Sequence, residues 1–145
     1  MNARATAYWV TTAFLVFNIL AGGLAELAQL KGNAEGMLVL GYPLYVMTIL
    51  GTWKVLGSIA LLAPRFPRLK EWAYAGIFFN MSGAAVSHIV VGDEAWHAYY
   101  TASLAMVTLI SWALRPESRT LGTPLSRRNL PVVGQTRLAG ADARG

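Results

Sequence analysis

The chain has 145 residues, of which 55% are hydrophobic and only 13% are charged. Soluble domains contain about 25% charged residues, so this composition argues against an ordinary soluble enzyme. The absence of cysteine excludes disulfides, thiol catalysis and cysteine-ligated metal sites. The net charge of +5 would suggest nucleic-acid binding in a polar protein. Here the apolar runs decide where those charges lie.

Four apolar runs are each long enough to cross a bilayer, which takes about 20 residues per helix. A cleavable signal peptide is the alternative for the first run, but that run exceeds the usual apolar region of about 7–15 residues. The runs predict an all-α fold, an integral membrane four-helix bundle formed by residues 1–115. The expected spans are residues 5–27, 43–63, 72–91 and 95–114.

Turn-forming and helix-ending residues separate the four runs. The sequence Lys31-Gly32-Asn33 predicts a turn after the first helix. Pro64 and Pro67 are expected to end the second helix, because proline cannot continue one. Asp93 is a candidate N-cap for the fourth helix, since a carboxylate there can accept a backbone N–H.

The positions of arginine and lysine predict the orientation, because these residues are enriched in cytoplasmic flanks. If both termini are cytoplasmic, only Lys31 lies on the opposite side and Lys54 lies inside the second span. We therefore expect a multi-pass membrane protein with an N-in, C-in topology, lipid contacts and no nucleic-acid partner. The basic residues on the expected cytoplasmic side are Arg4, Arg65, Arg68, Lys70, Arg115, Arg119, Arg127, Arg128, Arg137 and Arg144.

Residues 116–145 are rich in proline, glycine, serine, threonine and arginine and have no sustained apolar period. Such a segment buries too little apolar surface to offset the entropy lost on ordering. It is predicted to be a disordered basic cytoplasmic tail. Arg127 and Arg128 are expected to approach anionic lipid there.

Three polar residues lie at similar depth in three of the expected spans. At 1.5 Å per residue, Asn18, Lys54 and Asn80 are each about 14–17 Å from the outer end of their helix. Charged and amide side chains inside a membrane usually face the bundle interior or a wet cavity. Two interpretations stay open. The layer is packing, with Lys54 bonded to the two amides and to backbone carbonyls, or it is the polar floor of a pocket in which Lys54 transfers a proton or binds an acidic head group.

A second polar set lies near the outer surface and comprises Glu26, Tyr45, His88, His97 and Tyr99. Glu26 and His88 are each within one turn of a helix end, so they could form a pair that moves protons. For His97 a belt of interfacial side chains is the favoured interpretation, whereas both interpretations stay open for His88. Haem ligation by the two histidines is not expected, because no attachment motif accompanies them. No metal site is predicted.

Several short motifs together resemble the DoxX-like family of small four-helix bacterial membrane proteins. The resemblance runs from the first helix to Arg115 and leaves the basic tail outside. The motifs are Gly41-x-Pro43, Ile-Leu-Gly-x-Trp-Lys at 49–54, Leu-Lys-Glu-Trp-Ala-Tyr-Ala-Gly at 69–76, Gly83-Ala84, Ser87-His88 and Gly92-Asp93. The wider superfamily includes membrane subunits of oxidoreductases, among them a thiosulfate:quinone oxidoreductase.

The resemblance places the protein in the bacterial cytoplasmic (inner) membrane but does not identify a substrate. Our first hypothesis is a membrane component of a redox system that takes a quinone-like or other small apolar molecule into the bundle, with a membrane or redox partner subunit. In this hypothesis Lys54, His88 and Glu26 are candidate acid/base residues. The ligand contacts are expected from Asn18, Trp53 and Asn80. Two alternatives stay open: a non-catalytic structural or assembly subunit, and a small membrane-embedded acid/base enzyme such as an isomerase. Whether the protein is an enzyme is therefore not decided by the sequence.

Overall fold

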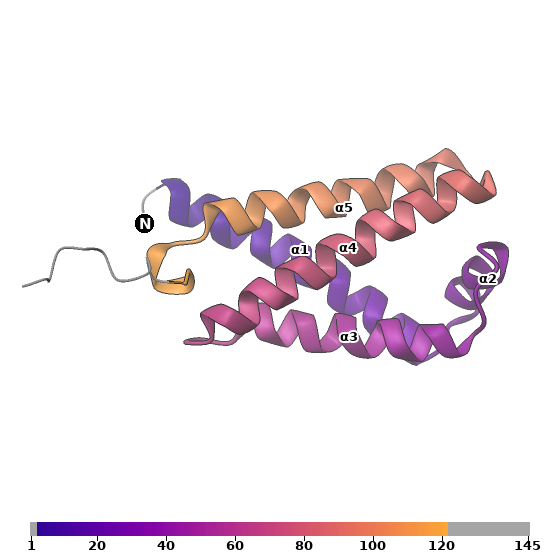
Figure 1. Cartoon of the computed structure of the whole chain (residues 1–145), viewed down its shortest axis with the longest axis horizontal. Coiled ribbons are helices and arrows are strands. Elements are labelled where there is room, and N and C mark those ends of the chain that lie inside the picture. The colour runs from indigo at the N-terminus through magenta and orange to yellow at the C-terminus, as the bar shows by residue number, and fades with distance from the viewer. Residues whose placement is uncertain (1–2, 122–145) are drawn as a thin grey trace, which may run out of the picture.

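The computed structural model describes residues 3–121, and all regular structure within that range is helical (Figure 1). This confirms the predicted all-α class. The elements in chain order are α1 (Ala3–Leu27), α2 (Lys31–Val39), α3 (Tyr45–Leu62), α4 (Pro67–Val91), α5 (Ala95–Leu114) and the 3-10 helix η1 (Glu117–Arg119).

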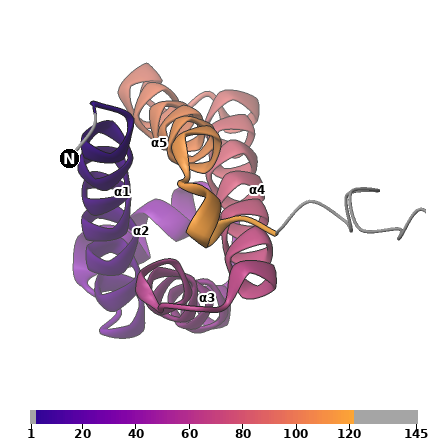
Figure 2. The same ribbon diagram turned by 90° about the vertical axis from the view of Figure 1, so that its left-hand side faces the viewer.

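The four long helices run alternately in opposite directions. Viewed along the helices, α1 lies against α3 and α5, and α4 lies against the same two helices from the other side (Figure 2). The start of α1, the α3–α4 turn and the end of α5 lie at one end of the molecule. The short helix α2 and the α4–α5 turn lie at the other end (Figure 1).

Three of the described helices are long and apolar enough to cross a membrane, namely α1, α3 and α4. Their large outward side chains are strongly exposed within the chain, such as Trp72 at 80% and Phe79 at 70%. Exposed apolar surface on this scale is stable only when something apolar covers it. These helices embed the protein in a membrane and contact the lipid bilayer. The helix α5 has the predicted bounds, but the polar residues in its first half set it apart from the other three.

Three local expectations about the helix ends are wrong. The segment expected to be a turn forms α2, whose nine residues are too few to cross a bilayer. Pro67, expected to end the second helix, instead begins α4, because proline suits the first turn of a helix. The N-cap of α5 is Glu94, with no side-chain cap bond, and Asp93 makes other contacts.

The start of the segment expected to be disordered packs against the helices. The guanidinium of Arg119 in η1 lies 4.6 Å from the centre of the Trp9 ring and donates to the carbonyl of Leu61 at 3.2 Å. The chain therefore stays folded a few residues beyond Pro116. Residues 122–145, with Arg127 and Arg128, lie outside the described residues.

A chain of hydroxyls crosses the helix interior next to the apolar core. The hydroxyl oxygen of Ser111 lies 2.8 Å from that of Thr12 and 2.8 Å from that of Tyr74. All three side chains are buried. Because each hydroxyl has a partner on another helix, the chain ties α1, α4 and α5 together without leaving a polar atom unpaired.

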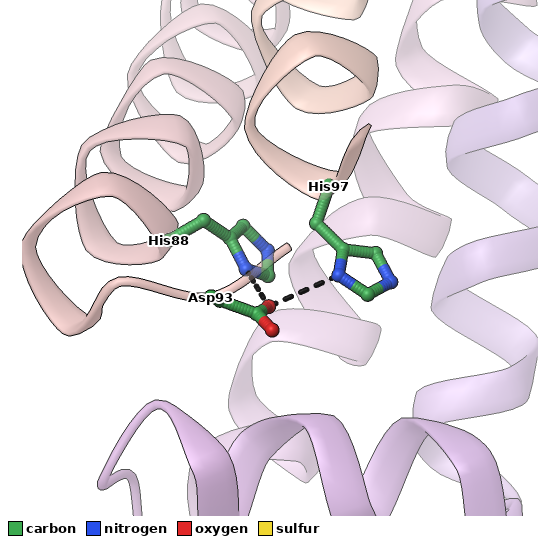
Figure 3. A group of neighbouring side chains, drawn as sticks. All are labelled: His88, Asp93 and His97. Carbon is green, nitrogen blue, oxygen red and sulfur yellow. Dashed lines mark hydrogen bonds and ion pairs between the residues drawn. The ribbon is translucent and has the colours of Figure 1, made fainter. Parts of the chain in front are cut away.

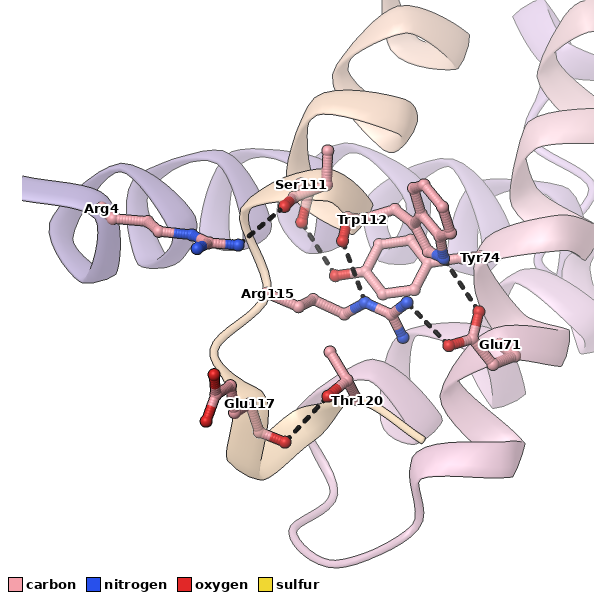
Figure 4. Close-up of polar contacts among 9 residues, drawn as sticks. Arg4, Glu71, Tyr74, Ser111, Trp112, Arg115, Glu117 and Thr120 are labelled. Atoms are coloured by element: carbon pink, nitrogen blue, oxygen red, sulfur yellow. Dashed lines mark hydrogen bonds and ion pairs between the residues drawn. The ribbon is translucent and has the colours of Figure 1, made fainter. Parts of the chain in front are cut away.

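Polar and ionic contacts join α4 to α5 at one end of the molecule. This is the end where α1 begins and α5 ends. Glu71 accepts from the Arg115 guanidinium at 2.7 Å and from the Trp112 indole N–H at 2.8 Å (Figure 4). Arg4 of α1 donates to the carbonyl of Ala113 at 3.3 Å. The basic residues Arg4, Arg115 and Arg119 therefore gather at one end.

Lys70 closes the C-terminal end of α3. Its side chain is 1% exposed, and its ammonium donates to the carbonyls of Ala60 and Leu61 at 2.9 Å each and to that of Ala63. The last carbonyls of a helix have no partner within the helix, and a cation there also favours the helix dipole. This buried lysine thus acts as a cap supplied by the next helix.

We expect Lys70→Met to lower the free energy of unfolding by about 1–3 kcal/mol, because buried carbonyls lose their donor. The change should appear in reversible unfolding in mixed detergent micelles. Arg68→Met is the matched control, since Arg68 is an exposed basic residue of the same helix turn, and it should change the unfolding free energy by no more than about 0.5 kcal/mol. Equal effects of the two substitutions would contradict the capping role.

Candidate functional site

A cavity of about 460 Å³ opens between the long helices toward the end that carries α2. Its lining includes five of the six residues proposed from the sequence: Asn18, Glu26, Lys54, Asn80 and His88. The sixth, Trp53, does not line this cavity. Residues from separate helices, selected only by depth and polarity, therefore meet around one space.

Lys54 makes an ion pair with Glu26, joining α3 to α1. The side chains are 13% and 10% exposed, and the second carboxylate oxygen of Glu26 is buried without a hydrogen-bond partner among the described residues. Two pairings that the sequence left open are thus not formed among the described residues: Lys54 donates to Glu26 and not to the two amides, and His88 contacts Asp93 and not Glu26. A buried pair with one unused oxygen can still accept a hydrogen bond from a ligand.

The pairing follows from the way α1 and α3 cross. A Cβ on Gly23 would lie 2.8 Å from the Cβ of Lys54, and a Cβ on Gly51 would lie 2.7 Å from the carbonyl oxygen of Gly23. The two backbones can approach this closely only because both positions are glycine. The stem of Lys54 consequently lies against α1, and Glu26 stands one helical turn beyond Gly23.

The two amides of the cavity differ in what they offer. Asn18 donates to the carbonyl of Phe14 at 2.8 Å and accepts from the Tyr100 hydroxyl at 2.9 Å. Its contacts thus match the packing interpretation. The Oδ1 of Asn80 is buried and has no hydrogen-bond partner within residues 3–121. Because a buried acceptor without a partner is costly, Asn80 is the amide best suited to bind a donor from a ligand.

A second space lies beside the floor of the cavity and shares residues with it. This groove of about 350 Å³ lies between α3 and α4, and Trp53 and Trp72 form part of its wall. Lys54 and Asn80 line both the cavity and the groove. Trp53 is 67% exposed, as expected for a groove that opens outward. Lys54 and Asn80 thus border both the polar cavity and a groove that faces outward between two membrane helices.

The helix α2 and the segment after it form the wall of the cavity farthest from the floor. Asn33 and Met37 of α2 line the cavity, and the Tyr42 hydroxyl lies 2.9 Å from that of Ser87 on α4. Sequence reasoning missed this wall, because a helix of nine residues with low apolar content gives no spanning signal. Tyr45, expected near the same surface, is 66% exposed and does not line the cavity.

His88 and His97 line the cavity beside the α4–α5 turn, and Asp93 lies between their rings (Figure 3). The Oδ2 of Asp93 is 2.7 Å from Nδ1 of His88 and 3.0 Å from Nδ1 of His97. The backbone N–H of Glu94 and the ring of His88 lower the pKa of Asp93, so it is a carboxylate at neutral pH. Two imidazoles and a carboxylate are a donor set that can hold a metal ion.

The roles of Asp93 and His97 were not predicted from the sequence. Asp93 was assigned to a helix cap, and His97 to an interfacial belt. The sequence signal that could have indicated this cluster is the spacing His-x4-Asp-x3-His, which includes a glycine at the end of a helix. Asp93 and His97 are four residues apart, a spacing that places side chains on the same face of a helix.

Comparison with known protein families finds one match over most of the chain. The model of the DoxX-like family matches residues 10–114, which include all four long helices in whole or in large part. Comparisons with curated proteins and with solved structures find no match. The matched range contains every residue of the cavity floor and of the turn between α4 and α5. The chain therefore belongs to the DoxX-like family.

Proposed function

We propose that this protein is a four-span component of a redox system in the bacterial inner membrane, and that it binds a small amphipathic quinone-like molecule. The observation that carries the proposal is that Lys54 and Asn80 line both the polar cavity and the outward-facing groove. A molecule dissolved in the bilayer can place its apolar part in the groove and its polar head on that floor.

The proposal takes α5 as the fourth span of a four-helix bundle. Its 20 residues are enough to cross a bilayer. Several of its hydroxyls donate within the helix: Thr101 to the carbonyl of His97, Thr108 to that of Leu104, and Ser103 to that of Tyr100. Polar atoms satisfied in this way are tolerated in a membrane helix, which supports a span despite the lower hydropathy.

The N-in, C-in topology is also part of the proposal. The ends of the helices that carry Arg4, Arg115 and Arg119 lie at the same end of the molecule as the α3–α4 turn (Figure 1). That turn contains Arg65, and the first turn of α4 contains Arg68. Placing this end in the cytoplasm satisfies the preference of basic flanks for that side. The cavity then opens toward the opposite side of the membrane, where Lys31 lies.

The polar groups of the floor suit both forms of a quinone. The ammonium of Lys54 can donate to a quinone carbonyl, and the unpaired oxygens of Asn80 and Glu26 can accept from a quinol hydroxyl. Reduction of a quinone to a quinol consumes two electrons and two protons. In this proposal a redox partner subunit supplies the electrons, as the family resemblance implies. Lys54, Glu26 and His88 carry protons to the quinone oxygens.

Binding can be tested with the purified protein and a decyl-substituted benzoquinone, which should quench tryptophan fluorescence because Trp53 and Trp72 line the groove. Asn80→Leu removes one hydrogen-bond partner and should weaken binding by about tenfold. Ser82→Ala is the control on the same helix, since Ser82 bonds only to carbonyls of its own helix. Mass spectrometry of the untreated protein should identify a copurified quinone or lipid.

Other outcomes would favour the remaining functions. Quenching that is unchanged by Asn80→Leu, together with a stable complex of defined size with another membrane subunit, supports a structural or assembly role. Quinone-independent turnover that is lost with Lys54 or His88 supports an acid/base enzyme such as an isomerase.

A further inference from the structure

We propose that His88, Asp93 and His97 form a binding site for a divalent transition-metal ion of the Zn²⁺ and Fe²⁺ class, at the wall of the cavity. The site shares His88 and the cavity wall with the proposed function, but metal binding there does not require the quinone-like ligand. Imidazole and carboxylate donors suit these metals. A set of two histidines and one carboxylate leaves coordination positions for water or another ligand.

The spacing of the three donors fits such an ion. With metal–nitrogen bonds of about 2.0–2.1 Å, neighbouring ligands of a tetrahedral site lie about 3.3 Å apart. Oδ2 of Asp93 lies 2.7 Å and 3.0 Å from the two Nδ1 atoms, and the three donor atoms all lie within 4.8 Å of one another. Small side-chain rotations therefore suffice to place an ion among them.

One of the three possible metal-binding atoms makes no hydrogen bond within the described residues. Nδ1 of His97 is buried and makes no hydrogen bond to any described residue, although Oδ2 of Asp93 is 3.0 Å away. A hydrogen bond requires alignment as well as proximity, and of the two histidines His88 alone forms one with the Asp93 carboxylate. A bound cation would satisfy the buried nitrogen and both other donors at once.

The backbone holds the three residues in place. Gly92 has φ +73° and ends α4 in a left-handed conformation, which glycine adopts without a steric penalty. The N–H of Asp93 donates to the carbonyl of His88 at 3.0 Å. The rings of His88 and His97 are stacked, with their centres 5.2 Å apart. A site organised before binding loses less entropy when the ion arrives.

The orientation of the two rings gives the site access to the cavity. Both histidines line the cavity, whereas Asp93 does not. A ligand in the cavity could thus reach the open coordination positions of the ion. The site lies at the end of the molecule opposite to that of Arg4, Arg115 and Arg119 (Figure 1).

The test is a titration of the full chain with Co²⁺ and Zn²⁺ in detergent, carrying a histidine-free tag. The chain has only two histidines, so both imidazole signals can be followed by nuclear magnetic resonance. We expect Zn²⁺ to shift both Nδ1 resonances at one ion per chain. Co²⁺ should give visible absorption bands that Zn²⁺ abolishes by competition.

Asp93→Asn and His97→Gln should each weaken Zn²⁺ binding by at least about 100-fold, since even outer-shell changes cost 10–100-fold. Glu94→Gln is the control, because it removes an exposed neighbouring acid outside the donor set and should leave affinity unchanged. A wild-type protein whose histidine resonances do not move with saturating Zn²⁺ would overturn the proposal, as would equal affinity in wild type and Asp93→Asn. The wild-type titration is decisive even if a variant does not fold.

Discussion

Replacing Lys54 by methionine will lower the free energy of unfolding by about 3–5 kcal/mol, because breaking a buried ion pair leaves one charge without a partner. The remaining charge is the carboxylate of Glu26, of which the side chain is only 10% exposed. Reversible unfolding in mixed detergent micelles measures the loss. The methionine keeps most of the length of the lysine stem, so the packing against α1 changes little.

The double variant Lys54→Met/Glu26→Gln separates the charge from the packing. With both charges removed, no uncompensated ion stays buried, and the double variant should recover most of the stability lost in the single one. A thermodynamic cycle with Glu26→Gln completes the measurement. If the double variant is as unstable as Lys54→Met alone, the loss comes from packing and the ion pair contributes little.

The same double variant also tests the proposed function without relying on a damaged fold. It removes the donor to a quinone carbonyl and leaves the groove and its tryptophans in place. We expect the decyl-substituted benzoquinone to bind at least about tenfold more weakly, as for one lost charged hydrogen bond. Undiminished binding by a folded double variant would exclude Lys54 from the ligand site.

Much of the fold follows from the apolar runs, since a membrane requires a minimum length of apolar helix. The fourth expected run, 95–114, coincides with α5 (Ala95–Leu114), and the first differs from α1 only at its start. The same logic missed α2, because nine residues of mixed composition carry no spanning signal. The expected span 72–91 lies within α4, whose first five residues include charged side chains and therefore carry no apolar signal.

The candidate site was predictable by location but not by contact. Depth along each helix correctly gathers Asn18, Lys54 and Asn80 around one space, because helical rise is constant. The partner of Lys54 was not predictable in this way. It depends on how closely α1 and α3 approach and on how far a flexible side chain reaches along the neighbouring helix. The arrangement of Asp93 and His97 depends in turn on the left-handed conformation of Gly92.

The crossing of α1 and α3 predicts opposite effects for two adjacent glycines. Alanine at Gly23 would bring its Cβ to 2.8 Å from the Cβ of Lys54 and 3.1 Å from the carbonyl oxygen of Gly51, whereas nothing lies within 4 Å of a Cβ at Gly22. Gly23→Ala should therefore lower the free energy of unfolding by about 1–3 kcal/mol through overpacking. Gly22→Ala should raise it by about 0.5–1 kcal/mol, because glycine is unfavourable inside a helix.

The difference between the two variants isolates the contact, since both make the same chemical change in the same helix turn. Gly23→Ala should also weaken the coupling between Lys54 and Glu26, because an added methyl group pushes the lysine stem away from α1. Gly22→Ala should leave that coupling intact. If Gly23→Ala proves as stable as Gly22→Ala and keeps the full coupling, the two helices can separate without loss. Close backbone approach would then not be what brings the charged pair together.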